Sequence, residues 1–341
     1  MRAQTAWLVI FLGALAIALV MTPVARAVAV RVGMVDHPAS RKLHTRPIPL
    51  LGGLALYLAV LLALLLFEGR YNLPQLAGIL AGATAISFLG IWDDRWGMRP
   101  LIKLAGQVLI AGVVMATGVT VSLFPWPILN LLVTLLWLVG ITNAFNLIDN
   151  MDGLSGGIGA VAAAFFLLLA ALNGQYLVGA MAAAVLGACI GFLRYNFNPA
   201  SIFMGDAGSL FLGFLMAVLG IKLRFPNNVA FVTWMVPVLV LGIPIFDTAL
   251  VVLSRLRRGL NPLTTPGKDH LSHRLVRAGL THREAVLTLY LAQVTLGVLA
   301  MFVAMAGALE SYLIGGLVVG FALWALWRLE QPPFFEPPAR R

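Results

Sequence analysis

Charged residues are scarce in this chain, and their scarcity excludes an ordinary soluble domain. Of 341 residues, 11% are charged and 61% are hydrophobic, whereas soluble domains carry about 25% charged residues. No linker or low-complexity tract interrupts the apolar runs. We therefore expect an all-α integral membrane protein, with one helical membrane domain over residues 1–330 and a Pro-rich tail over residues 331–341.

Cysteine is nearly absent as well. The single one, Cys189, lies inside an apolar run, so an intrachain disulfide is excluded and thiol chemistry is disfavoured. The chain also lacks a soluble domain that could carry its net charge of +10, which argues against a nucleic-acid partner. The positive charge instead fits attraction to the anionic head groups of membrane lipid.

Long apolar runs are what the chain does contain. A spanning helix needs about 20 apolar residues, and charged or Gly/Pro-rich breaks divide the sequence into about eleven such runs. They lie near residues 6–28, 48–67, 74–92, 101–119, 126–145, 154–172, 176–193, 207–223, 229–254, 284–307 and 311–328. The sequence thus predicts a polytopic bundle of about 11 transmembrane helices.

The loops between these runs differ in charge according to the side on which they fall. When the runs are followed in order, 19 of the 23 Lys and Arg residues lie on one side. Because cytoplasmic loops carry the basic excess, we expect N-out/C-in topology with the tail in the cytoplasm. All five histidines and every acid except Glu68 and Glu310 also lie on or near the inner side.

An acidic pair, Asp93 and Asp94, closes the third run at its inner end. The dipole of this helix disfavours negative charge at its C-terminus, and adjacent carboxylates repel each other unless a cation or Arg95 neutralises them. A hard divalent ion such as Mg²⁺, bound by carboxylate and phosphate oxygens, would do so. A solvated acidic loop tip is the alternative interpretation.

Four polar side chains recur at three-residue spacing at Asn143, Asn146, Asp149 and Asp152. On a helix they would form one stripe. Such a stripe at the membrane boundary is costly unless it faces protein or a water-filled site. Amides supply hydrogen bonds and carboxylates supply ion ligands, so the stripe predicts a polar site. Asp152 taken alone could instead cap the next helix.

Asp206 ends the segment Phe203-Met204-Gly205-Asp206, directly before another span. It could cap that helix. Equally, a helix N-terminus with neighbouring glycines suits the approach of a phosphate group. The segment alone does not decide between the two.

Two basic loops complete the inner face. The first holds Arg41, Lys42 and His44, and the second holds His270 and His273. Positive-inside topology accounts for scattered basic residues but does not call for two histidines beside Asp269. A histidine-only metal centre is the weaker interpretation, because no further His or Cys accompanies them.

Asp247 is a separate signal, because it lies inside the ninth run after Pro244. An acid within a span is costly and usually has a partner. Pairing with an Arg or Lys of the bundle is the structural interpretation of this residue.

Together these motifs resemble the bacterial polyprenyl-phosphate N-acetylhexosamine-1-phosphate transferases, in the WecA-like branch of the family that also contains MraY. The resemblance covers roughly residues 33–285. It implies a bundle of about ten or eleven helices with a cytoplasmic groove. Two positions depart from the family pattern: Ser272 replaces the middle histidine of the late motif, and Asn150 replaces a frequent glycine. The first leaves the exact sugar open, and neither removes an expected metal ligand.

The resemblance also implies roles for individual residues. Catalytic roles fall on Asp93, Asp94, Asp149, Asp152 and Lys103. Metal ligation falls on Asp206, with Asp94 or Asp149. Substrate binding falls on Asn143, Asn146, Asn196, Phe203, Arg41, Lys42, His44, His270, His273 and Arg274. Within these sets, Phe203 is expected to contact uracil and Asp93 to steer or deprotonate the acceptor.

The implied reaction is Mg²⁺-dependent transfer of GlcNAc-1-phosphate from UDP-GlcNAc to undecaprenyl phosphate or another polyprenyl phosphate, with Mn²⁺ as a substitute metal. The products would be polyprenyl diphosphate-GlcNAc and UMP, in the first membrane step of cell-envelope glycan synthesis. We expect the site on the cytoplasmic face of the bacterial inner membrane. A homodimer and a covalent aspartyl intermediate both stay open.

Two other functions compete with this one. An MraY-like enzyme would act on UDP-MurNAc-pentapeptide, but the first basic loop and the degenerate histidine motif favour the smaller amino sugar. An ion-coupled transporter would use intramembrane acids as relays and would show broken helices in repeats. The motif acids other than Asp247 lie at inner helix ends, and no repeat is evident. Both observations favour the enzyme.

Overall fold

The computed structural model describes residues 3–37, 46–65, 73–226, 228–262, 264–265 and 267–335. Three expected substrate-binding residues, Arg41, Lys42 and His44, lie outside the described residues.

Helices account for most of the described chain. In order they are α1 (Ala3–Val32), α2 (Gly52–Leu65), α3 (Leu73–Trp96), α4 (Pro100–Ala116), α5 (Pro127–Ile148), α6 (Leu154–Leu172), α7 (Tyr176–Asn196), α8 (Gly205–Lys222), α9 (Ala230–Thr233), α10 (Met235–Val240), α11 (Gly242–Arg257), α12 (Leu271–Arg277), α13 (His282–Met305) and α14 (Ala308–Leu329). Two short strands, β1 (Val35–Asp36) and β2 (Ile48–Pro49), pair antiparallel between α1 and α2.

The described helices confirm the expected all-α polytopic membrane protein. Eight of them are long and apolar enough to cross a membrane, and the bent stretch from α9 to α11 is a ninth candidate. The shorter apolar helices α2 and α4 occupy the positions of two further expected spans. The total of eleven spans and the N-out orientation remain predictions.

The expected span at 229–254 is broken rather than straight. Its two parts, Ala230–Val240 and Gly242–Arg257, meet at 77°. Pro244 has no N–H to donate to the carbonyl of Val240, and its ring crowds that carbonyl. Gln293 of α13 takes up the freed groups: its Nε2 donates to Val240 O at 2.7 Å, and its Oε1 accepts from Ile243 N at 3.3 Å. The break is therefore satisfied inside the apolar bundle.

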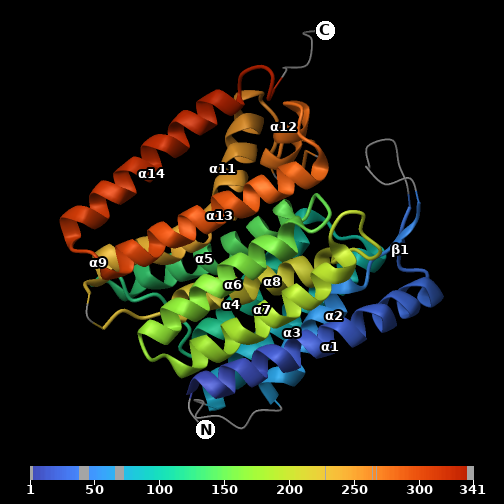
Figure 1. Cartoon of the computed structure of the whole chain (residues 1–341), viewed down its shortest axis with the longest axis horizontal. Coiled ribbons are helices and arrows are strands. Elements are labelled where there is room, and N and C mark those ends of the chain that lie inside the picture. The colour runs from blue at the N-terminus through green and yellow to red at the C-terminus, as the bar shows by residue number, and fades with distance from the viewer. Residues whose placement is uncertain are drawn as a thin grey trace.

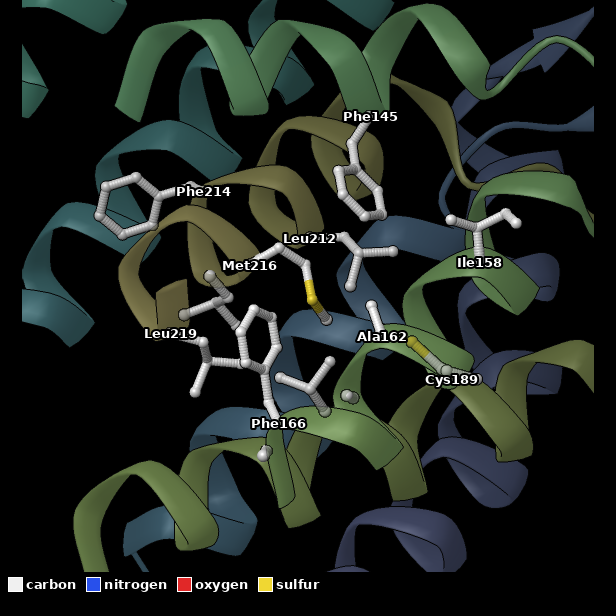
Figure 2. Close-up of a cluster of buried hydrophobic side chains, with 14 of the residues drawn as sticks. Phe145, Ile158, Ala162, Phe166, Cys189, Leu212, Phe214, Met216 and Leu219 are labelled. Carbon is white, nitrogen blue, oxygen red and sulfur yellow. The ribbon is translucent and has the colours of Figure 1, made fainter. Parts of the chain in front are cut away.

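The core is centred on α8. Every residue of α8 from Ala207 to Ile221 is buried, and side chains from α5, α6 and α7 pack around it (Figure 2). Phe145 of α5, Phe166 of α6 and Met216 of α8 itself are among the buried side chains of this core. Helices α1 and α14 lie at opposite edges of the bundle (Figure 1). The start of α8 is therefore held firmly in place, and the polar cavity described next forms around it.

The β1–β2 pair ties the α1–α2 connection to the start of α8. Phe203 N donates to Pro49 O at 2.8 Å, and Gly52 N donates to Phe203 O at 2.9 Å. Gly53 N likewise donates to Met204 O at 2.8 Å, so residues 203–204, directly before α8, are fixed from one side by backbone hydrogen bonds.

Candidate active site

A polar cavity of about 880 Å³ opens at the end of the bundle where α1, α3, α5 and α7 end and α2, α8 and α13 begin. Eight of the expected site residues line it: Asp94, Asn146, Asp149, Asp152, Asn196, Phe203, Asp206 and His273. Five other expected residues are not part of its wall: Asp93, Lys103, Asn143, His270 and Arg274. The helix order therefore brings acids from three separate segments, α3, the α5–α6 loop and the start of α8, to one place.

One cation stands at the centre of this arrangement. The Lys103 Nζ lies 2.9 Å from Asp93 Oδ2, donates to Asn146 Oδ1 at 3.1 Å, and forms an ion pair with Asp206. We call these residues, together with Asp94, the aspartate cluster. Lys103 lies in the first turn of α4 and contacts residues of α3, α5 and α8, so a single ammonium group holds four helices and two carboxylates together.

Asp94 caps the N-terminus of α8 rather than any part of its own helix. Its Oδ1 accepts from Asp206 N at 2.9 Å and its Oδ2 accepts from Ala207 N at 3.0 Å. The free N–H groups and the positive end of the α8 dipole stabilise this carboxylate. The cap explains why an acid is placed at the unfavourable end of α3. The spacing of residues could not predict this contact, because Asp94 and the start of α8 are far apart in the chain.

Two glycines let α3 approach α8 closely enough for this cap. Gly205 has φ +69°, and a Cβ at this position would lie 2.6 Å from Asp94 Oδ2. Gly90 is one helical turn before Asp94, and a Cβ there would overlap the carbonyl oxygen of Asp206. Only glycine meets both conditions at Gly205, because other residues rarely adopt positive φ.

Asp206 is held by its neighbours on both oxygens. Its Oδ1 accepts from Asn146 Nδ2 at 2.8 Å, and its Oδ2 meets Lys103. Asn146 Nδ2 also donates to Ser209 Oγ at 2.9 Å. The N-cap of α8 is Met204, so Asp206 lies in the first turn without acting as the cap that the sequence left open.

The expected stripe from 143 to 152 does not run along one helix. Helix α5 ends at Ile148, so only Asn143 and Asn146 are helical. Asn143 exchanges amide hydrogen bonds with Gln107 of α4, with Gln107 Nε2 at 3.3 Å from Asn143 Oδ1. Sequence analysis missed Gln107, although it lies four residues after Lys103 in an otherwise apolar helix, on the same face.

Asp149 follows the last residue of α5 and lines the cavity. Burial raises its pKa to about 8, and the negative charges of Asp206, Asp94 and Asp152 act in the same direction. Within the described part of the chain, no residue donates a hydrogen bond to its carboxylate. Asp149 thus faces the cavity without a hydrogen-bond donor, and its raised pKa keeps it largely protonated at neutral pH unless a cation lowers that pKa.

Asp152 and Asn196 fix the loops around the cavity. Asp152 Oδ2 accepts from Asn198 Nδ2 at 3.0 Å. Asn196 accepts from Gly153 N at 3.1 Å and donates to Ile202 O at 2.9 Å. The N-cap of α6 is Gly153, which has φ +77°, so Asp152 joins the α5–α6 loop to the α7–α8 loop and does not cap a helix.

A second polar group faces the cavity from α12. His273 lines the wall, and its ring lies 6.3 Å from that of His270, centroid to centroid. Burial lowers the pKa of His273 to about 4, with further lowering by His270 and Lys268. His273 is therefore neutral at physiological pH.

Asp247 pairs with His270 and not with the Arg or Lys that the sequence suggested. The two side chains are buried, and His270 Nδ1 lies 2.8 Å from Asp247 Oδ2. Asp247 Oδ1 also accepts from Leu271 N at 2.6 Å. The intramembrane acid of the ninth run is thus used to hold the start of α12.

The two positions that depart from the family pattern touch each other. Ser272 Oγ donates to Asn150 Oδ1 at 2.6 Å. Asn150 lines the cavity beside Asp149, and Ser272 lies one residue before His273. This hydrogen bond joins the acidic loop after α5 to the histidine helix α12.

Behind α12 lies a group of charges that we call the arginine cluster: Arg255, Arg258, Asp269, Arg274 and Glu330. Arg255 Nε and Arg258 Nη2 lie 3.1 and 3.0 Å from Asp269 Oδ2. Burial alone would raise the pKa of Asp269, but Arg258 and Arg255 outweigh it and lower the pKa below the usual value.

Arg274, an expected substrate ligand, belongs to this cluster and does not reach the cavity. Its side chain is fully buried. It donates to Leu329 O at 2.7 Å and to Ser254 Oγ at 3.0 Å, and it lies 2.8 Å from Glu330. Phe335 of the tail stacks under its guanidinium at 4.9 Å. Arg274 thus joins α11, α12, α14 and the first residues of the tail.

The oxygen ligands of the cavity suit a hard divalent cation by their chemistry. In the described residues, however, no three His, Cys, Asp or Glu side chains already form a metal-binding group. Asp94 is used by backbone N–H groups and Asp206 by Lys103 and Asn146. Asp149 has no hydrogen-bond donor among the described residues and a raised pKa, so it is the residue whose ionisation a bound cation would most directly favour.

Comparison with known proteins gives consistent matches. Residues 76–224 match the family model described as glycosyl transferase family 4. The chain is 38% identical over 294 residues to a probable undecaprenyl-phosphate N-acetylglucosaminyl 1-phosphate transferase of Bacillus subtilis, covering 83% of this chain and 81% of the relative. A decaprenyl-phosphate N-acetylglucosaminephosphotransferase of Mycolicibacterium smegmatis is 34% identical, and the match covers 78% of this chain and 74% of the relative. An undecaprenyl-phosphate alpha-N-acetylglucosaminyl 1-phosphate transferase of Yersinia pestis is 30% identical, and the match covers 90% of this chain and 88% of the relative.

Proposed function

The chain belongs to glycosyl transferase family 4, and from that premise we propose that it transfers GlcNAc-1-phosphate from UDP-GlcNAc to a polyprenyl phosphate. The products are polyprenyl diphosphate-GlcNAc and UMP. The observation that carries this proposal is the convergence of Asp94, Asp149, Asp152 and Asp206 on one cavity beside Lys103. Relatives that cover most of the chain are named as transferases of N-acetylglucosamine phosphate to undecaprenyl or decaprenyl phosphate, which supports this acceptor and this transferred group.

The reaction chiefly requires control of negative charge. A phosphate monoester has a second pKa of about 6, so the lipid phosphate is largely dianionic at neutral pH and needs no strong base. One of its oxygens attacks the sugar-linked phosphorus in line, a bond forms there, and the bond from that phosphorus to the UMP oxygen breaks. Catalysis of this step rests mainly on positioning and electrostatic stabilisation.

Several residues are placed to supply that stabilisation. Lys103 offers a fixed positive charge next to Asp206. Asn146 holds Asp206 in place by hydrogen bonding. Asp93 of α3 also pairs with the Lys103 ammonium group and is our candidate for steering the acceptor. Phe203 lines the cavity and offers an aromatic face for the uracil ring.

Mg²⁺ is part of this proposal, with Asp149 and Asp206 as its carboxylate ligands and Mn²⁺ as a substitute. When bound, the ion would balance the charge of the phosphates and of the open Asp149 carboxylate. Chelation with EDTA should therefore abolish turnover, and added Mg²⁺ should restore it. Full activity in a chelated, metal-free preparation would remove the ion from the proposal.

We place the cavity on the cytoplasmic side of the inner membrane. The basis is the positive-inside rule applied to loops at the same end of the bundle. Both a membrane-bound polyprenyl phosphate and a soluble nucleotide sugar can reach a cavity at that boundary.

The most informative experiment is a panel of donors. Purified protein in lipid discs would receive UDP-GlcNAc, UDP-GalNAc or UDP-MurNAc-pentapeptide, each with and without undecaprenyl phosphate, and UMP release would be measured. We expect release with UDP-GlcNAc that depends on the acceptor. Preference for UDP-MurNAc-pentapeptide would make the chain MraY-like, and no release with any donor would refute the transferase.

A further inference from the structure

The buried acid Asp247 is left over once the cavity is described. It is 1% exposed, it lies on α11 within the bent candidate span, and it is not part of the cavity wall. A carboxylate in such a place is costly unless partners offset its desolvation. Its partners are therefore the guide to its role.

The break between α10 and α11 sets the position of Asp247. Gln293 takes the backbone groups freed at Val240 and Ile243, so α11 can leave the axis of α10 at 77° without an unsatisfied polar group. Asp247 is in the second turn of α11. The redirected helix thus carries this carboxylate to the first residue of α12.

Each carboxylate oxygen of Asp247 has one donor from the histidine helix. The Oδ1 takes the first N–H of α12, from Leu271, at 2.6 Å, and the Oδ2 lies 2.8 Å from His270 Nδ1. A carboxylate can only accept hydrogen bonds. The proton of His270 must therefore be on Nδ1 for this contact to form.

His273 is the next residue on the same face, three positions further along α12. It lines the cavity, and its ring packs edge to face against that of His270. A change at Asp247 would thus reach the cavity through His270 and the first turn of α12.

We propose that Asp247 is a positioning residue: by holding the His270 proton on Nδ1 and the first N–H of α12, it fixes the orientation in which α12 presents His273 to the polar part of the donor substrate. The expected ligand group is a hydroxyl or phosphate oxygen of the nucleotide sugar, met by a neutral imidazole. The catalytic consequence rests on the proposed function, whereas the proton position does not.

The test uses Asp247→Asn in the full chain. The amide keeps an oxygen for Leu271 N–H but places an NH₂ group against His270 Nδ1. The proton of His270 should then move to Nε2. Nitrogen-15 spectra of histidine-labelled protein, with the His270 signal assigned from a His270→Gln sample, report the position directly. We expect a protonated Nδ1 in the unchanged chain and a protonated Nε2 in the variant.

Turnover provides the second readout. We expect kcat/KM to fall about 10- to 100-fold in Asp247→Asn, the range usual when a carboxylate that orients an imidazole is lost. In a His273→Gln background the same change should cause no further loss, because its effect passes through His273. Glu310→Gln, which removes a carboxylate at the start of α14, should leave both readouts unchanged.

Three results would overturn the proposal: a His270 ring protonated on Nε2 and not on Nδ1 in the unchanged chain, normal turnover of Asp247→Asn, or losses that simply multiply in the double variant. The last would indicate a general structural role. If the unchanged chain releases no UMP, the proposed function fails, but the nitrogen-15 result still decides whether Asp247 fixes the His270 proton.

Discussion

The aspartate cluster and the arginine cluster lie at the same end of the bundle but differ in their balance of charge. The first gathers three aspartates around one lysine, and the second gathers three arginines around two acids. In the arginine cluster, Arg274 is fully buried and bonded to Leu329, Ser254 and Glu330. In the aspartate cluster, one Lys103 serves two aspartates, and the nearby Asp149 is left open to the cavity. Charges that are fully partnered hold elements together, whereas a carboxyl group that lacks a hydrogen-bond donor beside a cavity is available to a ligand.

The sharpest way to break this comparison is to remove Arg274. Arg274→Gln should lower stability by about 3–5 kcal/mol, the usual effect of breaking a buried ion pair, because Glu330 loses its partner. The KM for UDP-GlcNAc of the protein that remains folded should not change. Thermal unfolding and steady-state kinetics below the unfolding temperature measure the two effects. A raised KM with normal stability would instead return Arg274 to substrate binding.

Removing Lys103 should instead lower turnover. Lys103→Met leaves Asp93 and Asp206 without their shared cation, and we expect kcat to fall about 10²- to 10³-fold, the range typical for loss of one stabilising charge at a reacting centre. Lys222→Met, at the far end of α8, is the matched control and should keep normal turnover. Equal losses in the two variants would mean that net charge, not the cluster, is responsible.

The bond between Asn150 and Ser272 joins the acidic loop to the histidine helix, and a double-mutant cycle can measure it. Asn150→Ala and Ser272→Ala should each destabilise the protein by about 1 kcal/mol, the value of a typical hydrogen bond. The double variant should lose little more than either single variant. Strictly additive losses would show that the two side chains do not act together.

The smallest expected effect is the response of stability to acid through His273. Its pKa is lowered to about 4, mainly by burial, whereas the pKa of a histidine in the unfolded chain is about 6.5. Between these values the unfolded state binds a proton that the folded state does not, so folding loses stability as pH falls from about 6.5 towards 4. Melting temperatures at neutral and mildly acidic pH should therefore differ less for His273→Gln than for the unchanged chain.

Most of the fold could be predicted from the sequence, because apolar runs between charged breaks report directly on spanning helices. The bend between α10 and α11 was not predicted, because an apolar run has the same hydropathy whether its helix is straight or bent. Pro244 and Gly242 carried the signal. The end of α5 at Ile148 was missed for a similar reason: three-residue spacing fits a helix but does not show where the helix stops.

The sequence predicted which residues belong to the candidate site but not which of them form hydrogen bonds with one another. Acids at inner helix ends pointed to a shared location, and eight of the expected residues line one cavity. The cap that Asp94 provides to α8 and the pairing of Asp247 with His270 join residues far apart in the chain. Such contacts depend on helix packing, which residue spacing within one segment cannot reveal.

The most direct test of the account is turnover of Asp206→Asn beside the unchanged chain, with labelled UDP-GlcNAc and undecaprenyl phosphate in the same lipid discs. Asp206 lies where Lys103, Asn146 and the cavity meet. The account predicts acceptor-dependent UMP release by the unchanged chain and a loss of about 10²-fold or more in the variant. Near-normal release by Asp206→Asn would contradict it.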